Sequence, residues 1–290
     1  MTHTNSDTPT ESHFSPRRIT LAGLRQMKQR GEKFAMLTAY DYPTARAAQV
    51  AGVHSLLVGD SMGMVVLGHS STREIPLSAL LLVAEAVRRG APSPFLIGDM
   101  PFEAMASGDS AVLAAAHAFL TAGCDAVKIE CEPHHAELIG KVSRAGIPAI
   151  AHLGLRPQAV TTSDGYRAQA RDDAGLRELV AIARRMEQAG ASMLLIEAVP
   201  PEAAEAVCRA VSILVVGCGA GPSCDGHVVV THDMLGLGPA KPPKFVPVLA
   251  DLNGAIESAM KRYVAAIAGG EYPGPQHSYS MRSITHGANR

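Results

Sequence analysis

Four apolar segments of this 290-residue chain each lead into an acidic residue. These residues are Asp60, Asp99, Glu130 and Glu197, and three of the segments also follow a glycine at nearly the same spacing. An apolar run bounded by glycine predicts a buried parallel strand, so each carboxylate would emerge where its strand ends. Several such ends on one rim would gather the acids around a cavity. Such a ring of acids predicts a divalent-cation site together with a general base.

Other side chains that could do chemistry lie beside these acids. Lys128 precedes Glu130 by two residues, so both point to the same side of the strand. A lysine inside a fold is costly unless it is paired, so we expect it to bind a substrate carboxylate, with a structural ion pair as the alternative. Ser61 follows Asp60 directly. His152 ends the fifth apolar segment, where a substrate contact and a hydrogen-bonded core position both stay open.

The expected metal is Mg²⁺, with Asp60 and Asp99 as direct ligands and Glu130 bound either directly or through water. Each acid has an alternative role, because a carboxylate at a strand end can cap the following helix. For Asp233, after the eighth segment, capping is the favoured interpretation. The glycine-rich stretch 217–221 fits either a phosphate-binding loop or simply a sharp turn.

These residues must be positioned by alternating elements. The predicted strands are 34–40, 53–59, 95–98, 124–129, 147–152, 192–196, 212–217 and 227–231, and the predicted helices between them are 43–51, 78–89, 109–122, 134–145, 172–189 and 201–210. Eight βα units predict an α/β fold, a closed (β/α)8 TIM barrel whose active site lies at the C-terminal strand ends. An open doubly wound sheet is the alternative, which the lack of G-x-G-x-x-G after the first strand disfavours.

The chain is expected to form a single barrel domain over 18–290. It would carry a C-terminal helix over 248–268 and an irregular tail after about residue 270. Residues 1–17 are polar, and we expect a leader that is disordered or binds a partner subunit.

Composition argues against several classes of protein. There are 26 Lys and Arg against 27 Asp and Glu, a net charge of −1, which disfavours a nucleic-acid partner. No run approaches the roughly 18 apolar residues of a membrane helix, and the N-terminus lacks the apolar segment of a secretory signal. Five cysteines, an odd number, lie within apolar segments, which indicates reduced thiols and a cytoplasmic protein.

The motifs together resemble the ketopantoate hydroxymethyltransferase (3-methyl-2-oxobutanoate hydroxymethyltransferase) family. The matching stretches are TAYDYPTA (38–45), LLVGDSMGMVVLGHSST (56–72), AVRRGAP (86–92), DMPF (99–102), VKIE (127–130), AHLGLRPQ (151–158), IEAVP (196–200), GCGAG (217–221), CDG (224–226), HDMLGL (232–237), PKFV (243–246) and YPGPQHSY (272–279). The likeness therefore covers nearly the whole chain, from about residue 18 to 279.

The resemblance implies transfer of a hydroxymethyl group from 5,10-methylenetetrahydrofolate to 2-oxo-3-methylbutanoate through a magnesium-stabilised enolate. The product is ketopantoate, on the route to pantothenate and coenzyme A. It also implies a cytoplasmic homo-oligomer, often a decamer.

The resemblance assigns roles to individual residues. It places metal ligation on Asp60, Asp99 and Glu130, and proton abstraction on Glu197. Substrate contacts fall on Asp60, Ser61, Asp99, Lys128 and His152.

The chain departs from the family pattern at Val83, Cys131, Glu132, Asp164 and His227. A relative that acts on a different 2-oxo acid is therefore one alternative. A magnesium-dependent oxo-acid lyase or mutase of the isocitrate lyase or phosphoenolpyruvate mutase type is a second. A non-catalytic relative that binds an oxo acid is a third.

Overall fold

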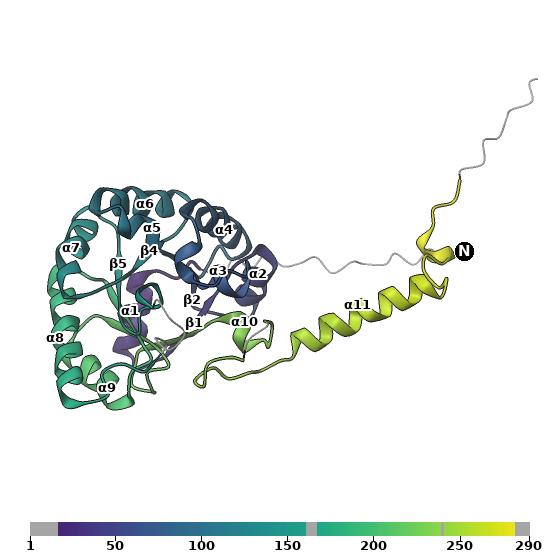
Figure 1. Cartoon of the computed structure of the whole chain (residues 1–290). Coiled ribbons are helices and arrows are strands. Elements are labelled where there is room, and N and C mark those ends of the chain that lie inside the picture. The colour runs from purple at the N-terminus through teal and green to yellow at the C-terminus, as the bar shows by residue number, and fades with distance from the viewer. Residues whose placement is uncertain (1–16, 161–166, 239–240, 282–290) are drawn as a thin grey trace, which may run out of the picture.

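An eight-stranded parallel barrel forms the body of the protein (Figure 1). The computed structural model describes residues 17–160, 167–238 and 241–281. Each strand pairs with the next along the chain, and β1 also pairs with β8, so the sheet closes on itself. The strands are β1 (Phe34–Thr38), β2 (Ser55–Val58), β3 (Phe95–Asp99), β4 (Ala126–Glu130), β5 (Ala149–Gly154), β6 (Met193–Glu197), β7 (Leu214–Cys218) and β8 (Gly226–Val229). The predicted TIM barrel is confirmed, and the open doubly wound sheet is wrong.

Six helices that cover the barrel agree with the predicted ranges to within two residues at each end. They are α2 (Tyr42–Val50), α4 (Leu77–Gly90), α6 (Asp109–Thr121), α7 (Ala136–Arg144), α8 (Asp173–Ala189) and α9 (Pro201–Ala210). Local chemistry explains their limits. At the start of α2, for example, the Asp41 carboxylate accepts a hydrogen bond from the backbone N–H of Thr44 at 2.7 Å, which satisfies a free donor of the first turn.

Four helices were not predicted. They are α1 (Leu21–Gln29), α3 (Met62–Val65), α5 (Phe102–Ala106) and α10 (Thr231–Met234). Helices α3, α5 and α10 are too short for an apolar period to be visible in the sequence. They lie in the connections that follow β2, β3 and β8, at the end of the barrel where the acids emerge. The predicted leader lies, apart from Arg17, outside the described residues.

The predicted strands begin early in several places, and Asp125 illustrates why. Its carboxylate accepts from the backbone N–H of Leu96 at 2.8 Å and contacts Arg88 at 2.6 Å. Asp125 therefore uses its side chain to hold the start of β3 and helix α4 in place, and β4 begins one residue after it. In contrast, β5 extends two residues beyond the predicted end at His152, because its last residue, Gly154, pairs with Glu197 of β6.

The barrel interior is apolar at its base. Alternate residues such as Phe95, Ile150 and Leu214 point inward and pack together, and Leu24 of α1 packs with them with none of its surface exposed. Helix α1 thus closes the N-terminal end of the barrel. The same alternation places Lys128 inward, in the polar layer above this plug.

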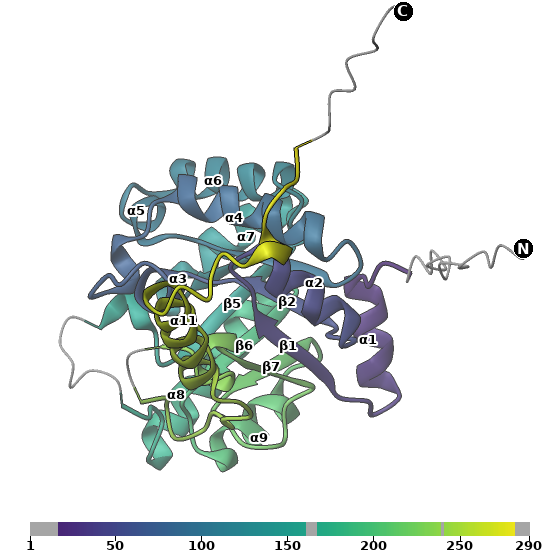
Figure 2. The ribbon, with the colours of Figure 1, turned by 90° about the vertical axis from the view of Figure 1, so that its right-hand side faces the viewer.

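Helix α11 (Leu252–Ala268) leaves the barrel instead of covering it (Figure 1). The predicted start at 248 was four residues early, because Asp251 is the N-cap and accepts from the backbone N–H of Gly254. In Figure 2 the helix stands out in front of the strands. None of its residues is buried, yet one face carries large apolar side chains. These are Ile256, Met260, Tyr263, Val264 and Ile267, each between 39% and 66% exposed.

No helix within the described ranges is long and apolar enough to cross a membrane.

Candidate active site

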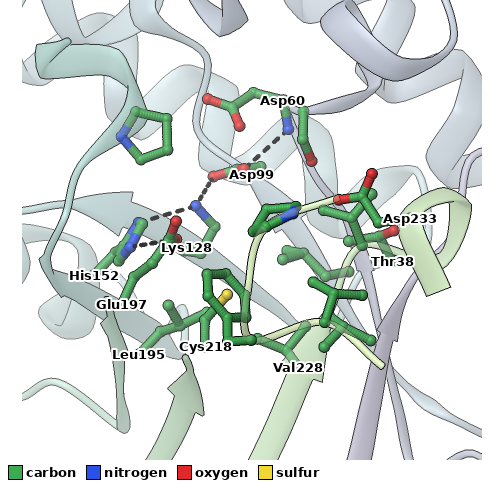
Figure 3. Close-up of a pocket in the computed structure, with 18 residues that line it drawn as sticks. Thr38, Asp60, Asp99, Lys128, His152, Leu195, Glu197, Cys218, Val228 and Asp233 are labelled. Atoms are coloured by element: carbon green, nitrogen blue, oxygen red, sulfur yellow. Dashed lines mark hydrogen bonds and ion pairs between the residues drawn. The ribbon is translucent and has the colours of Figure 1, made fainter. Parts of the chain in front are cut away.

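A cavity opens at the C-terminal ends of the strands (Figure 3). The centres of water-sized molecules can occupy about 120 Å³ of it, which is room for several water molecules or a small ligand. Polar side chains from the β2–β6 side line one half, and apolar side chains from β8 and the loop after it line much of the other. The polar half holds every predicted site residue except Glu130, namely Asp60, Ser61, Asp99, Lys128, His152 and Glu197.

Asp60 and Asp99 come from neighbouring strands and lie side by side. The backbone N–H of Asp60 donates to Oδ2 of Asp99 at 3.0 Å. Both side chains belong to residues with 4% or less of their surface exposed. The register between β2 and β3 pairs Val58 with Gly98, which places Asp99 level with Gly59, one residue before Asp60.

Four side chains from successive strands form a continuous row across the cavity floor (Figure 3). Oδ1 of Asp99 lies 2.8 Å from Nζ of Lys128, and Nζ lies 3.3 Å from Nδ1 of His152. Nε2 of His152 in turn lies 3.3 Å from Oε2 of Glu197. The row therefore connects a buried cation with a carboxylate that could act as a base.

This row fixes the protonation of His152. An ammonium group can only donate hydrogen bonds, so Nδ1 of His152 accepts from Lys128 and Nε2 carries the proton of the neutral ring. Burial, and then the positive charge of Lys128, lower the pKa of His152 below its ordinary value. The imidazole is therefore neutral near pH 7. The Glu197 side chain is 18% exposed, which leaves it accessible from the cavity.

The buried acidic side chains at this end of the barrel outnumber the buried cationic groups that could offset their charge. Burial, and then the charge of Asp60, raise the pKa of Asp99 to about 8, while Lys128 opposes the rise. Burial lowers the pKa of Lys128, but the charges of Asp99, Asp60 and Glu130 outweigh it and the pKa rises. Three buried carboxylates thus share one buried ammonium group. A bound divalent cation would offset the excess negative charge.

The donor atoms fit Mg²⁺. They are hard carboxylate oxygens, and Mg²⁺ commonly binds through one or two carboxylates with water or substrate oxygens completing its shell. Among the residues that the structure describes, no three His, Cys, Asp or Glu side chains form a ready-made metal cage. Ligation through Asp60 and Asp99 with non-protein oxygens is consistent with both observations.

Glu130 is held behind the cavity wall by Gln158, a residue that sequence reasoning missed. The backbone N–H of Gln158 donates to both oxygens of Glu130, at 3.1 and 3.2 Å. Its side-chain Nε2 donates to Oδ2 of Asp60 at 2.8 Å and to the carbonyl of Met100 at 2.9 Å. Gln158 is 5% exposed. The AHLGLRPQ stretch was visible in the sequence, but nothing there indicated that its glutamine reaches another strand.

The capping alternative for the four acids is wrong. The N-caps of the helices that follow β2, β3, β4 and β6 are Ser61, Pro101, Glu132 and Pro200. The Ser61 hydroxyl shares a hydrogen bond of 2.8 Å with the hydroxyl of Tyr40.

Asp233 is not a cap either. It lies inside α10, whose N-cap is Val230 with no side-chain cap bond. Its side chain instead lines the cavity.

The apolar half of the cavity is built by β8 and the loop after α10. Its side chains include Val229, Val230, Pro243, Phe245 and Val246. The glycine-rich stretch 217–221 supports this wall. Gly219 has φ +64°, and a Cβ there would lie 2.5 Å from Cδ1 of Phe245. Glycine is therefore required for the turn and for the approach of the ring.

Comparison with known proteins decides the family. A family model described as ketopantoate hydroxymethyltransferase matches residues 18–275. The chain belongs to this family. A 3-methyl-2-oxobutanoate hydroxymethyltransferase from Geobacillus kaustophilus is 42% identical over 257 residues, covering 88% of this chain and 92% of the relative. Its counterpart from Mycobacterium ulcerans is 44% identical, covering 88% of this chain and 86% of the relative.

Solved structures share the fold at much lower sequence identity. A 2,3-dimethylmalate lyase, described as a member of the PEP mutase/isocitrate lyase superfamily, superposes with a TM-score of 0.58. The two chains are 19% identical, and the match covers 90% of this chain and 93% of the lyase. At this identity the likeness establishes the barrel fold alone.

Four of the five departures from the ketopantoate hydroxymethyltransferase pattern do not contribute to the described cavity lining, namely Val83, Cys131, Glu132 and His227. Cys131 is buried with Sγ donating to the carbonyl of Ile129 at 3.2 Å, and Glu132 pairs with Arg156 at 2.7 Å. Asp164 lies outside the described residues.

Proposed function

We propose that the protein transfers a hydroxymethyl group from 5,10-methylenetetrahydrofolate to 2-oxo-3-methylbutanoate, giving ketopantoate. The observation that carries the proposal is the row from Asp99 through Lys128 and His152 to Glu197, in a chain of this family. The row offers a buried cation for a substrate carboxylate and, two contacts further on, a carboxylate for proton abstraction.

Binding of the oxo acid would use the polar half of the cavity. Lys128 would offset the charge of the substrate carboxylate, and the Ser61 hydroxyl, oriented by Tyr40, would help to fix its pose. Asp60 and Asp99 would hold Mg²⁺, with Glu130 acting from behind through Gln158 or through water. A bound Mg²⁺ would supply Lewis-acid stabilisation of the charge that develops on the keto oxygen.

Glu197 would remove the proton from C3 of the substrate. Nε2 of His152 lies 3.3 Å from its carboxylate, and a hydrogen bond formed there on substrate binding would hold the carboxylate in place. The C3–H electron pair becomes the enolate, and C3 then forms the new bond to the methylene carbon carried by the folate. Overall, one water supplies the hydroxyl oxygen and tetrahydrofolate leaves.

The protein would work as a homo-oligomer in the cytoplasm. The apolar face of α11 supports the first part, because a helix of 17 residues without a single buried residue must be covered elsewhere. A second copy of this chain is the proposed cover. The resemblance implies a decamer. The five free cysteines support a reducing compartment.

One assay tests the activity. The purified protein is incubated with 2-oxo-3-methylbutanoate, 5,10-methylenetetrahydrofolate and Mg²⁺, and ketopantoate is measured. Formation of ketopantoate that requires both the folate and Mg²⁺ is expected. If the protein turned over an oxo acid without folate, it would be a lyase or mutase and not a transferase. If it acted only on another 2-oxo acid, the proposed acceptor would be wrong.

Exchange of the substrate C3 proton in deuterated water gives a second readout. It reports enolate chemistry without the folate. Absence of exchange together with absence of product would indicate a non-catalytic binder.

A further inference from the structure

Among the described residues that line the half of the cavity formed by β8 and the loop after it, Asp233 is the one with an acidic side chain. Its neighbours in the lining are Val229, Val230, Pro243 and Phe245. Figure 3 places it across the cavity from Lys128 and Glu197. A carboxylate on an otherwise apolar wall indicates a ligand with hydrogen-bond donors at one edge.

The backbone around Asp233 is firmly held. Two residues earlier, the Thr231 N–H donates to Oγ1 of Thr38 at 3.0 Å, and the Thr231 hydroxyl donates to the Thr38 carbonyl. Both threonines are buried, so α10 is fixed to the end of β1. Within the described residues, no hydrogen bond or ion pair engages the Asp233 carboxylate. Burial raises its pKa above the ordinary value, a cost that a pair of N–H donors from a ligand would offset.

We propose that the Asp233 carboxylate recognises the pterin ring of the folate, accepting hydrogen bonds from the ring N3–H and the 2-amino group. The inference rests on the proposed function and assigns one residue to the co-substrate. The two donors are adjacent and parallel, which matches the two oxygens of a carboxylate.

The position of the carbon donor supports this assignment. The methylene carbon must reach C3 of an oxo acid bound at Lys128, so the folate has to occupy the other half of the same cavity. There the flat pterin would lie against Phe245 and Pro243, with aromatic contact to the phenylalanine ring. The glutamate end of the folate carries negative charge and would be repelled by Asp233 and by the acids beyond it. It would therefore point toward the solvent.

The test compares two ligands on three forms of the protein. The ligands are tetrahydrofolate and its 2-desamino-2-methyl analogue, which lacks the amino donor. The forms are the wild type, Asp233→Asn and a control, Asp41→Asn. The control removes a charge from the same rim, outside the cavity lining, and asparagine caps a helix nearly as well as aspartate.

The wild type and Asp41→Asn should bind tetrahydrofolate roughly 10- to 100-fold more tightly than the analogue, as expected for loss of a hydrogen bond to a charged group. Asp233→Asn should bind both ligands with similar, weakened affinity. Folate-independent exchange of the substrate C3 proton should stay within about twofold in the Asp41→Asn control, because Asp41 is absent from the described lining of the cavity.

If Asp233→Asn still bound tetrahydrofolate more tightly than the analogue by the wild-type ratio, the assignment of Asp233 would be overturned. The proposed transferase activity would be unaffected by that result. Equal binding of the two ligands by the wild type would overturn the assignment too, and this comparison needs no variant. If the wild type forms no ketopantoate and binds no tetrahydrofolate, the proposed function fails and the role of Asp233 fails with it.

Discussion

Gln158 reaches across the barrel rim to Asp60, with its Nε2 at 2.8 Å from Oδ2 of the carboxylate. The same residue holds Glu130 through its backbone N–H. One buried glutamine thus fixes two carboxylates that leave the sheet at β2 and β4. Partners of this kind orient metal ligands and are often as important as the ligands themselves.

Replacement of Gln158 by Met should weaken Mg²⁺ binding by roughly tenfold or more, because the Asp60 carboxylate loses its orienting donor. Isothermal titration calorimetry of the variant with Mg²⁺ measures the effect. Gln49→Met is the matched control. Gln49 accepts from the backbone N–H of Ser93 at 3.0 Å, near the start of β3, so its loss should affect stability without changing Mg²⁺ affinity. Equal affinities in wild type and Gln158→Met would remove this role from Gln158.

Replacement of Glu197 by Gln should lower the rate of C3 proton exchange by roughly 10²- to 10⁴-fold, the usual contribution of a positioned general base. The amide keeps an oxygen for the Nε2–H of His152, so the melting temperature should change little. Exchange into deuterated water, followed by NMR, checks the rate. Glu132→Gln, on the loop outside the cavity lining, should exchange at the wild-type rate. Normal exchange in Glu197→Gln would mean that another group is the base.

Stability should depend on pH through Asp99. Its folded-state pKa of about 8 lies above the ordinary value of 3.8. The folded state therefore keeps a proton that the unfolded state has lost, and the resulting stabilisation disappears as the pH rises through 8. Between pH 7 and 8.5 the Mg²⁺-free wild type should lose about 1 kcal/mol of unfolding free energy from this group.

Asp99→Asn, which cannot titrate, should lose correspondingly less over the same pH range. Urea unfolding at the two pH values measures both slopes. Mg²⁺ should stabilise the wild type more at pH 8.5 than at pH 7, because fewer protons compete for the carboxylates. Identical slopes in the two proteins would show that Asp99 is ionised throughout this range.

A charge placed on the apolar face of α11 should reduce the size of the assembly. Met260→Glu would bury a carboxylate in the proposed contact between subunits, whereas Ser258→Glu lies on the opposite side of the same helix. Size-exclusion chromatography with light scattering, at one protein concentration, compares the two variants with the wild type. The expected result is a smaller particle for Met260→Glu alone. An unchanged mass for Met260→Glu would mean that this face is covered in another way.

The features that sequence could predict are those carried by short-range patterns. The apolar runs and helix-closing glycines identified the barrel, and the period of two placed Lys128 and Glu130 on one side of β4. The contact between Gln158 and Asp60 could not be predicted, because it depends on how the loop after β5 folds back over a neighbouring strand. Glu130 was expected beside the cavity, but that loop covers it.

The direction of α11 was also beyond sequence reasoning. The apolar face of α11 predicts that another surface covers the helix, but it does not indicate which surface that is. For Asp233, the capping interpretation rested on residue type and strand position. The N-cap of α10 is Val230, immediately before Thr231. Local sequence preferences do not locate the start of a four-residue helix this closely.

The apolar plug under the cavity, closed by Leu24 of α1, has a kinetic consequence. With the base of the barrel sealed, both substrates of the proposed reaction would have to enter by the same mouth. An oxo acid bound at Lys128 would lie deeper than the folate, so it would have to arrive first, and a folate already seated would block its path. Ketopantoate would likewise depart only after tetrahydrofolate, so the proposed reaction should follow an ordered sequential scheme.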